Sequence, residues 1–193
     1  LYLLFIIPFI GLGQQTYVPD DAFENYLENN GMGNGISNDN YVTTSNIQSN
    51  TVTNLYLPSL GIFDLTGIED FTYLSTINCN FNNLTTIDLS NNQNLSIVKC
   101  KNNQLTTFDM RNGSNQSINI FITTGNPNLT CVYVDNVSYS TNNWINIDPW
   151  TNFCIPVTYV PDDNFESYLE NAGMGNGILN DNYVSTDAIS SSN

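Results

Sequence analysis

The stretch LSTINCNFNNLTTIDLSNNQNL, residues 74–95, is followed in the same register by LSIVKCKNNQLTTFDM, residues 95–110. Six apolar positions of the first stretch and one asparagine return 21 residues later. The matched positions are Leu74, Ile77, Cys79, Asn82, Leu84, Ile87 and Leu89, then Leu95, Val98, Cys100, Asn103, Leu105, Phe108 and Met110. Chance alternation does not explain seven matched positions in register, so this part of the chain is a structural repeat.

The spacing of the apolar residues indicates how each copy folds. In the L-x-L part, alternate side chains of a short strand point inward, and equivalent strands of successive copies pair in parallel. One copy cannot bury its apolar face alone, so the copies stabilise each other only as a stack. The pattern L-x-x-L-x-L-x-x-N-x-L is the signature of a leucine-rich repeat. The sequence therefore predicts a leucine-rich repeat solenoid, an α/β-type horseshoe of mostly short parallel β-strands.

Asparagines recur where each coil is expected to turn inward. An asparagine amide offers both donors and an acceptor, so it can satisfy buried backbone groups that no strand reaches. We expect a ladder of this kind from Asn82, Asn92 and Asn103.

The repeated motifs also resemble those of a known family. LTTIDLSNNQNL and CKNNQLTTFDM resemble the LTxLDLSNNxxL and CxNNQLTxLDV runs of the short-repeat, internalin-like class of bacterial leucine-rich repeat proteins. NPNLTC and the aromatic run that ends at Cys154 resemble the closing segment of the same class. The resemblance implies a secreted or surface-exposed binding module, and it carries no catalytic residues.

Composition restricts the classes of partner. The 193 residues include three basic and 18 acidic ones and no histidine, for a formal net charge of −15. Such a chain has no basic stripe to displace the counterions of nucleic acid, and anionic membrane surfaces repel it. We therefore expect a soluble extracellular surface with no nucleic-acid partner.

The chain opens with LYLLFIIPFIGLGQQ, an apolar run of signal-peptide length that is too short to span a bilayer as a helix. A buried core helix is the alternative, but Pro8 and the terminal position favour an incomplete signal peptide over residues 1–13. Export follows, so we expect a secreted or cell-surface protein with no membrane insertion after cleavage.

Residues 14–51 are predicted to form a helical N-terminal cap on the open end of the stack. A proline before two aspartates suits a helix start, and Phe23, Tyr26 and Leu27 form an apolar stripe at helical spacing. The acids and amides of the following loop suggest calcium, but an EF-hand alignment places Met32 at a ligand position. Solvated loop acids are the preferred interpretation.

The leucine-rich repeats are assigned to residues 52–110, and residues 111–157 to a last irregular coil and a C-terminal cap. The run RNGSNQS interrupts the period, after which Ile120 and Ile122 are expected to form the inward pair. Aromatic residues near the end are expected to cover the last coil, with a sugar-binding platform as the alternative: Trp144, Trp150 and Phe153.

The four cysteines divide into two pairs. Cys131 and Cys154 bracket the closing segment, and an exported protein is expected to join them in a disulfide. Cys79 and Cys100 occupy the same inward slot of adjacent coils, where strand spacing would allow a bond. Their stacked side chains favour free, buried thiols instead. A zinc site is not expected without histidine or C-x-x-C spacing.

From Thr158 the chain repeats residues 16 onward at a constant offset of 142, with 26 identities in 35 aligned positions. Residues 158–193 are therefore predicted to be the cap of a second, truncated repeat domain, and the native protein a tandem array.

The residues between the inward ones are expected to face the concave surface of the sheet. Two of the three basic residues fall on this face of one coil, which suggests a contact for an acidic peptide or an anionic glycan. Lysines that only keep an exposed sheet soluble are the alternative. The predicted ligand-binding residues are Tyr56, Asn78, Asn80, Lys99, Lys101 and Phe121, with the aromatic side chains as anchors.

Asp88 and Asp109 lie one coil apart, yet solvated acids are preferred over an acid/base pair because no cleft is implied. No nucleophile has a histidine partner. We predict no catalytic residues, no metal site and no cofactor. The leading hypothesis is extracellular binding of a protein or glycan. The alternatives are a structural tandem spacer or stalk of a surface adhesin, and a substrate-targeting module of a larger secreted enzyme.

Overall fold

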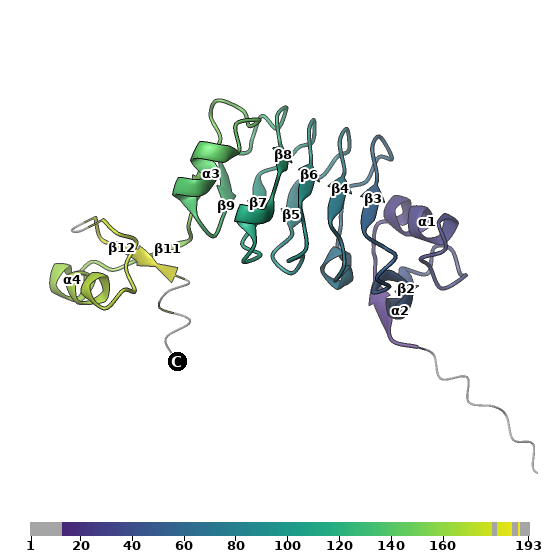
Figure 1. Ribbon diagram of the computed structural model, residues 1–193, viewed down its shortest axis with the longest axis horizontal. Coiled ribbons are helices and arrows are strands. Elements are labelled where there is room, and N and C mark those ends of the chain that lie inside the picture. The colour runs from purple at the N-terminus through teal and green to yellow at the C-terminus, as the bar shows by residue number, and fades with distance from the viewer. Residues whose placement is uncertain (1–12, 179–180, 187–188, 190–193) are drawn as a thin grey trace, which may run out of the picture.

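The computed structural model describes residues 13–178, 181–186 and 189. Its centre is a repeat-type fold of short parallel strands that stack side by side (Figure 1). The predicted signal peptide, except for Gly13, lies outside the described residues. Within the described ranges, no helix has the length and apolar character needed to cross a membrane.

Successive coils contribute strands to two parallel sheets. The first sheet has the order β3-β4-β6-β8, formed by Asn54–Tyr56, Thr76–Asn78, Ile97–Lys99 and Ile120–Ile122. The second has the order β10-β9-β7-β5, formed by Asn152–Cys154, Cys131–Tyr133, Thr107–Asp109 and Thr86–Asp88. Both sheets therefore continue past Met110, into the segment where the sequence period is interrupted.

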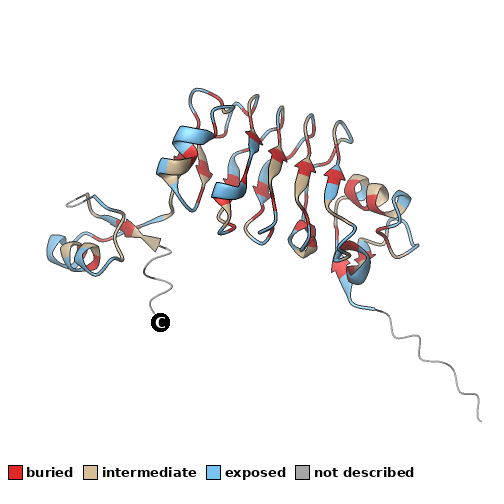
Figure 2. Ribbon diagram, in the orientation of Figure 1, coloured by how far each residue is buried: buried red, intermediate tan, exposed pale blue. Residues whose placement is uncertain are grey.

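The middle residue of each strand explains why the two sheets face each other. It is β-branched, aromatic or leucine, and it is buried, whereas its neighbours along the strand are more exposed (Figure 2). These inward residues belong to one continuous core: Leu55, Ile77, Val98 and Phe121 from the first sheet, and Ile87, Phe108, Val132 and Phe153 from the second.

An asparagine lies four residues after each of the strands β4, β6 and β8. The Nδ2 of Asn103 donates to the carbonyl of Cys100 at 3.2 Å and to that of Cys79, one coil earlier, at 3.0 Å. Its Oδ1 accepts from the Leu84 N–H at 3.1 Å. Asn82 repeats these contacts one coil earlier, and Asn126 extends the ladder beyond the predicted positions.

Asn92 lies at a different turn of the coil. It follows β5 rather than a strand of the first sheet, and its Nδ2 donates to the carbonyls of Ile68 and Phe71 at 2.9 and 3.2 Å. All three predicted asparagines thus bind buried backbone carbonyls, as the sequence indicated.

The N-terminal unit combines the antiparallel strands β1 (Gln15–Tyr17) and β2 (Tyr41–Thr43) with α1 (Asp21–Asn29) and α2 (Thr44–Ile47). The Oδ1 of Asp20 accepts from the N–H groups of Ala22 and Phe23 and so begins α1. Phe23 stacks on Phe71 of the first coil at a centroid distance of 6.2 Å. The apolar stripe of α1 is therefore part of the main core.

Two glutamates of α1 form hydrogen bonds with the loop that follows the helix. Glu24 is fully buried, and its two carboxylate oxygens accept from the N–H groups of Asp39 and Asn40 at 3.1 and 3.2 Å. Burial raises the pKa of Glu24. Glu28 accepts from the N–H groups of Asn34 and Gly35, so both glutamates hold the loop.

The last coil is closed by aromatic packing. After the short helices η1 (Ile68–Asp70) and η2 (Asn115–Ser117), the helix α3 (Val137–Asn143) leads to Trp144. Trp144 is buried and stacks on Phe121 at 4.3 Å between ring centroids, with Phe153 against its edge at 5.6 Å. Trp150 is about half exposed and is not part of this cluster.

The repeated segment folds as the sequence identity indicates. The strands β11 (Val157–Tyr159) and β12 (Tyr183–Ser185) pair antiparallel, and α4 (Asp163–Asn171) lies at the position of α1. This copy has a small core of its own, which contains Val160, Leu169 and Val184. Phe165 is 53% exposed, whereas the equivalent Phe23 is fully buried against the first coil.

The expected orientation of strand β8 is wrong by one residue. Val98 pairs with Phe121, so Phe121 points inward and is only 2% exposed, while Ile120 and Ile122 face outward. The interrupted period lengthens this coil, and side chains alternate along a strand, so a shift of one residue exchanges the two faces. Phe121 is therefore a core residue and not a ligand-binding residue.

This register predicts losses of stability of different size for two neighbouring substitutions. Phe121→Ala should lower the free energy of unfolding by about 3–5 kcal/mol, because it leaves a cavity under Trp144. Ile122→Ala should cost about 1 kcal/mol or less, because its side chain faces outward. Chemical denaturation of both variants checks the prediction, and a larger loss at residue 122 would contradict the register.

The asparagine ladder predicts a similar contrast. Asn103→Ala should lower the free energy of unfolding by about 1–3 kcal/mol, since it leaves the buried Leu84 N–H without its partner. The carbonyls of Cys79 and Cys100 keep the bonds from Asn82 and Asn126. The adjacent exposed residue provides the control, and Gln104→Ala should change stability by about 0.5 kcal/mol or less. Equal stability of the two variants would show that water replaces the amide.

Candidate binding surface

The outward residues of the first sheet form a column across the coils. Tyr56 pairs in register with Asn78, Asn78 with Lys99, and Lys99 with Ile122. Neighbouring residues of such a column are about 4.8 Å apart, so the four side chains share one surface. Tyr56 is the aromatic side chain of the column, and it is 67% exposed. The structure brings the predicted residues Tyr56, Asn78 and Lys99 together.

Asn80 and Lys101 follow the strands by two residues and lie beside each other. The Lys101 N–H donates to Oδ1 of Asn80 at 2.7 Å, and the Phe81 N–H donates to the Lys101 carbonyl at 2.8 Å. Oδ1 of Asn78 in turn accepts from the Asn80 N–H at 3.2 Å. The acceptor oxygens of both asparagines therefore hold the backbone, which leaves their Nδ2 groups as the atoms available to a ligand.

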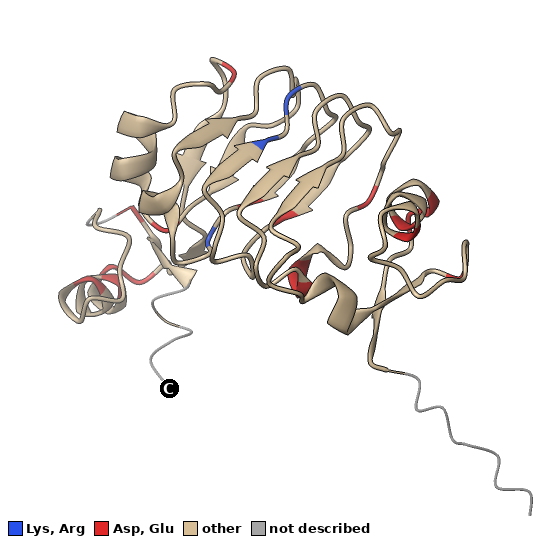
Figure 3. Cartoon of the chain, turned by 45° about the vertical axis from the view of Figure 1, so that its right-hand side comes forward, with Lys and Arg blue, Asp and Glu red and all other residues tan. Residues whose placement is uncertain are grey.

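The two lysines carry the positive charge of this surface. Lys101 is exposed and Lys99 is half-buried, and neither forms an ion pair with any residue that the structure describes. Figure 3 shows that many of the acidic residues lie on the helices at the two ends of the chain. An anion that approaches the centre of the first sheet thus meets two cations whose charge is not already neutralised.

Three isoleucines add an apolar part that the sequence interpretation missed. Ile122 occupies the fourth place of the column where Phe121 was expected, and Ile97 pairs with Ile120 two residues earlier along the strands. One alignment of INIFI places the pair Ile120 and Ile122 inward and the other places Phe121 inward, and both put apolar side chains in the core, so the pattern does not decide between them.

The acids Asp88 and Asp109 belong to the second sheet, where they pair in register on β5 and β7. Arg111 binds Asp109 through Nε at 3.0 Å and Nη2 at 2.5 Å, and its guanidinium lies 5.7 Å from the Tyr133 ring centroid. The third basic residue is thus engaged on the opposite side of the coils from the lysines. No group of three or more metal-ligating side chains occurs among the residues placed by the structure.

The cysteines behave as their positions predicted. Cys131 and Cys154 form a disulfide with a Cα–Cα distance of 6.0 Å, which joins the adjacent strands β9 and β10. Cys79 and Cys100 are free and fully buried, with their Sγ atoms 2.9 Å apart. Burial and the neighbouring thiol raise the pKa of Cys100, so its sulfur is not suited to act as a nucleophile. Cys79 is also buried away from solvent.

No family model matches the chain, and no curated protein matches it. Among solved structures, the chain is similar to the functional domain of InlJ from Listeria monocytogenes, described as including a cysteine ladder, at 22% identity and a TM-score of 0.42. That match covers 72% of this chain and 36% of the other. The CBM51-2 and INT domains of Clostridium perfringens ZmpB match at 22% identity and a TM-score of 0.40, covering 54% of this chain and 22% of that one. The chain therefore spans about a third and about a fifth of these two structures.

The state of the cysteines predicts a stepwise response to a disulfide-based thiol reagent. The native protein should react very slowly, because both free thiols are buried and the reagent cannot reach them. Unfolding without reductant should expose two thiols, and unfolding with reductant all four. Absorbance of the released thiol gives the count. Zero thiols after unfolding without reductant would indicate a bond between Cys79 and Cys100.

Proposed function

We propose that the chain is an internalin-like leucine-rich repeat solenoid with a helical N-terminal cap, and that it acts as an extracellular binding module. The two continuous parallel sheets and the asparagine ladder support the solenoid assignment. The stacking of Phe23 on Phe71 supports a capping role for α1. The Cys131–Cys154 disulfide fits an oxidising compartment, as expected for a secreted or cell-surface protein.

The binding site of this proposal is the outer face of the first sheet. The observation that carries it is the pair Lys99 and Lys101, without ion-pair partners among the described residues. They share the face of the first sheet with the exposed ring of Tyr56, in an acidic chain. Lysine donors and an exposed aromatic ring suit a protein or glycan ligand that carries an anionic group. The isoleucines at the far side of the column suit an apolar part of the same ligand.

We propose no catalytic activity for this module. Asp109 is held by Arg111, and the free thiols are buried away from solvent. Asp88 and Asp109 are the remaining candidates for acid/base chemistry, and the proposal requires that any hydrolytic activity of the preparation survive Asp88→Asn and Asp109→Asn unchanged. A loss of activity in either variant would replace the binding hypothesis with an enzymatic one.

A tandem spacer is the second candidate, and the internal duplication favours it. The units at residues 15–43 and 157–185 have the same order of strand, helix and strand, with the helices in the same place. A chain that repeats whole units is suited to hold another module at a distance, and such a role needs no ligand. One chain can serve both as a spacer and as a binding module. The identification of a ligand would therefore distinguish a binding module from a chain that is only a spacer.

The test is binding of the full chain to an array of acidic peptides and anionic glycans, beside a Lys99→Gln, Lys101→Gln variant. We expect the variant to bind the selected ligand at least about tenfold more weakly, because each charge-assisted hydrogen bond contributes about 1.5–3 kcal/mol. The affinity of the unmodified chain should also fall as salt is added.

Arg111→Gln is the control for a positive charge outside the proposed site. It removes one positive charge from the second sheet and should leave binding unchanged. Circular dichroism confirms that each variant is folded. No ligand for the unmodified chain would favour the spacer, and equal binding by all variants would place the site on another face.

A further inference from the structure

Strand β5 is the edge of the second sheet, and one side of its backbone has no partner strand. The Leu89 N–H donates to the Asp109 carbonyl, and the Thr85 carbonyl accepts from Thr106. Odd-numbered residues of β5 therefore face β7. Because backbone groups alternate in direction along a strand, the N–H and carbonyl groups of Thr86 and Asp88 point the other way.

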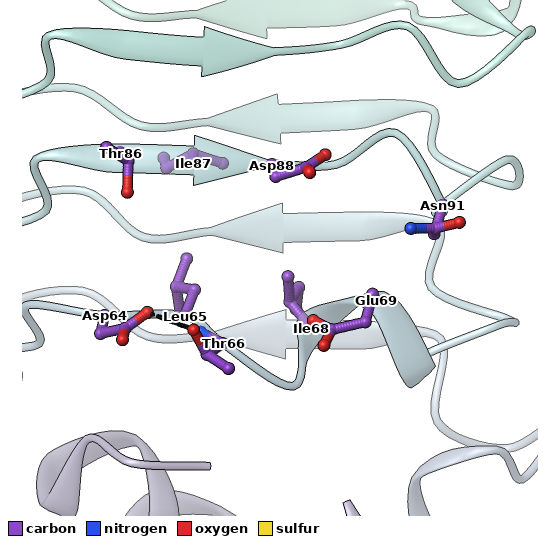
Figure 4. A pocket seen from close by; sticks show the side chains of 9 residues that line it. All are labelled: Asp64, Leu65, Thr66, Ile68, Glu69, Thr86, Ile87, Asp88 and Asn91. Atoms are coloured by element: carbon purple, nitrogen blue, oxygen red, sulfur yellow. Dashed lines mark hydrogen bonds between the residues drawn. The ribbon is translucent and has the colours of Figure 1, made fainter. Parts of the chain in front are cut away.

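The first coil does not fill the place beside β5. It supplies β3 to the first sheet, but its segment 64–69 forms no strand and no backbone hydrogen bond to β5 among the described residues. The gap is a hollow of about 340 Å³ (Figure 4). Its lining contains Asp64, Leu65, Thr66, Ile68, Glu69, Thr86, Ile87, Asp88 and Asn91.

The N-terminal unit explains why the first coil leaves this gap. Oδ2 of Asp20 accepts from the N–H groups of Phe63 and Asp64 at 2.7 and 3.1 Å. At the other end of the segment, the Thr16 hydroxyl donates to Asp70 at 2.5 Å. Gly67 lies so close to the Tyr17 carbonyl that a Cβ would be 2.8 Å from its oxygen. These contacts hold the segment against the N-terminal unit, away from β5.

The hollow has a defined chemistry. Asp64, Glu69 and Asp88 line it, and each uses one carboxylate oxygen to accept from a nearby N–H group. Their second oxygens have no partner among the described residues, and no basic side chain lines the hollow. Leu65, Ile68 and Ile87 supply apolar walls. A polypeptide in this place would meet negative charge, apolar side chains and an unpaired strand edge together.

We propose that the hollow binds an extended, basic segment of a partner polypeptide, which adds to β5 as a further strand of the second sheet. The main chain of the partner pairs with the N–H and carbonyl groups of Thr86 and Asp88. Its lysine or arginine side chains bind the unused oxygens of Asp64, Glu69 and Asp88, and its alternate apolar side chains contact Ile87. This site is separate from the lysine face of the first sheet.

The test uses the full chain and a six-residue peptide in which lysine and valine alternate. Calorimetry should detect binding that weakens with salt. A glutamate–valine peptide and a peptide of the original composition with a central proline should both fail to bind, the first through charge and the second through the lost N–H. Spermine tests for charge alone, and equal binding of spermine and peptide would overturn the proposal.

Amide hydrogen exchange measured by NMR gives the residue-specific result. The N–H groups of Thr86 and Asp88 should exchange rapidly in the free protein and be protected in the peptide complex. Binding without protection at these two residues would overturn strand addition, and so would the absence of any binding.

Charge variants separate this site from the rest of the acidic surface. Asp64→Asn with Asp88→Asn keeps the acceptor oxygens that hold the local turns, and should weaken peptide binding about tenfold or more. Asp135→Asn with Asp163→Asn changes the net charge equally outside the hollow and should have no effect. An equal loss in both double variants would contradict a local site. The Lys99→Gln, Lys101→Gln variant should bind the peptide normally, so this test does not depend on the function proposed above.

Discussion

The fold depends on how the chain satisfies backbone groups at the turn after each strand of the first sheet. There the backbone leaves the sheet and passes through the interior, where an unpaired N–H or carbonyl group costs about 1–3 kcal/mol. One asparagine in each coil forms hydrogen bonds with three such groups, some in its own coil and some in the previous one. The same side chain therefore closes a turn and joins two coils. Equal contacts by Asn82 and Asn126 keep successive strands aligned, so that their middle residues meet in one core.

Much of this arrangement was predictable because the repeat is regular. Within residues 74–110, the spacing of Leu74, Ile77 and Cys79 repeats without error, and the inward positions, the ladder asparagines and the stacked thiols all follow from it. Prediction was wrong where the period was interrupted. The segment INIFI offers an aliphatic pair in one register and a single phenylalanine in the other, and only the ring of Trp144 decides between them. That contact joins residues from different coils and has no local signal.

The candidate surface was predictable in part for the same reason. Tyr56, Asn78 and Lys99 lie in one column because the repeat places them there. The hollow beside β5 could not be predicted, since it results from an irregularity. Asp20 begins α1 with one oxygen and holds the first coil with the other, and this second contact is formed across more than forty residues of sequence. A pattern of apolar residues carries no information about such a contact, and Asp88, one of the carboxylates of the hollow, was interpreted as a solvated acid. The two faces of the coils consequently differ in charge, with free lysines on the first sheet and an acidic edge on the second.

The disulfide has a mechanical consequence for a chain that transmits force between its ends. Cys131 and Cys154 are 23 residues apart, and the bond between them joins neighbouring strands of the second sheet. Tension applied along the backbone passes through the sulfur atoms, so the enclosed segment, including α3 and Trp144, is not stretched while the bond is intact. The enclosed residues would add roughly 80 Å of contour length if the bond were reduced. The oxidised state of Cys131 and Cys154 thus limits how far the last coil extends under tension. It also protects the packing of Trp144 on Phe121 from the applied force.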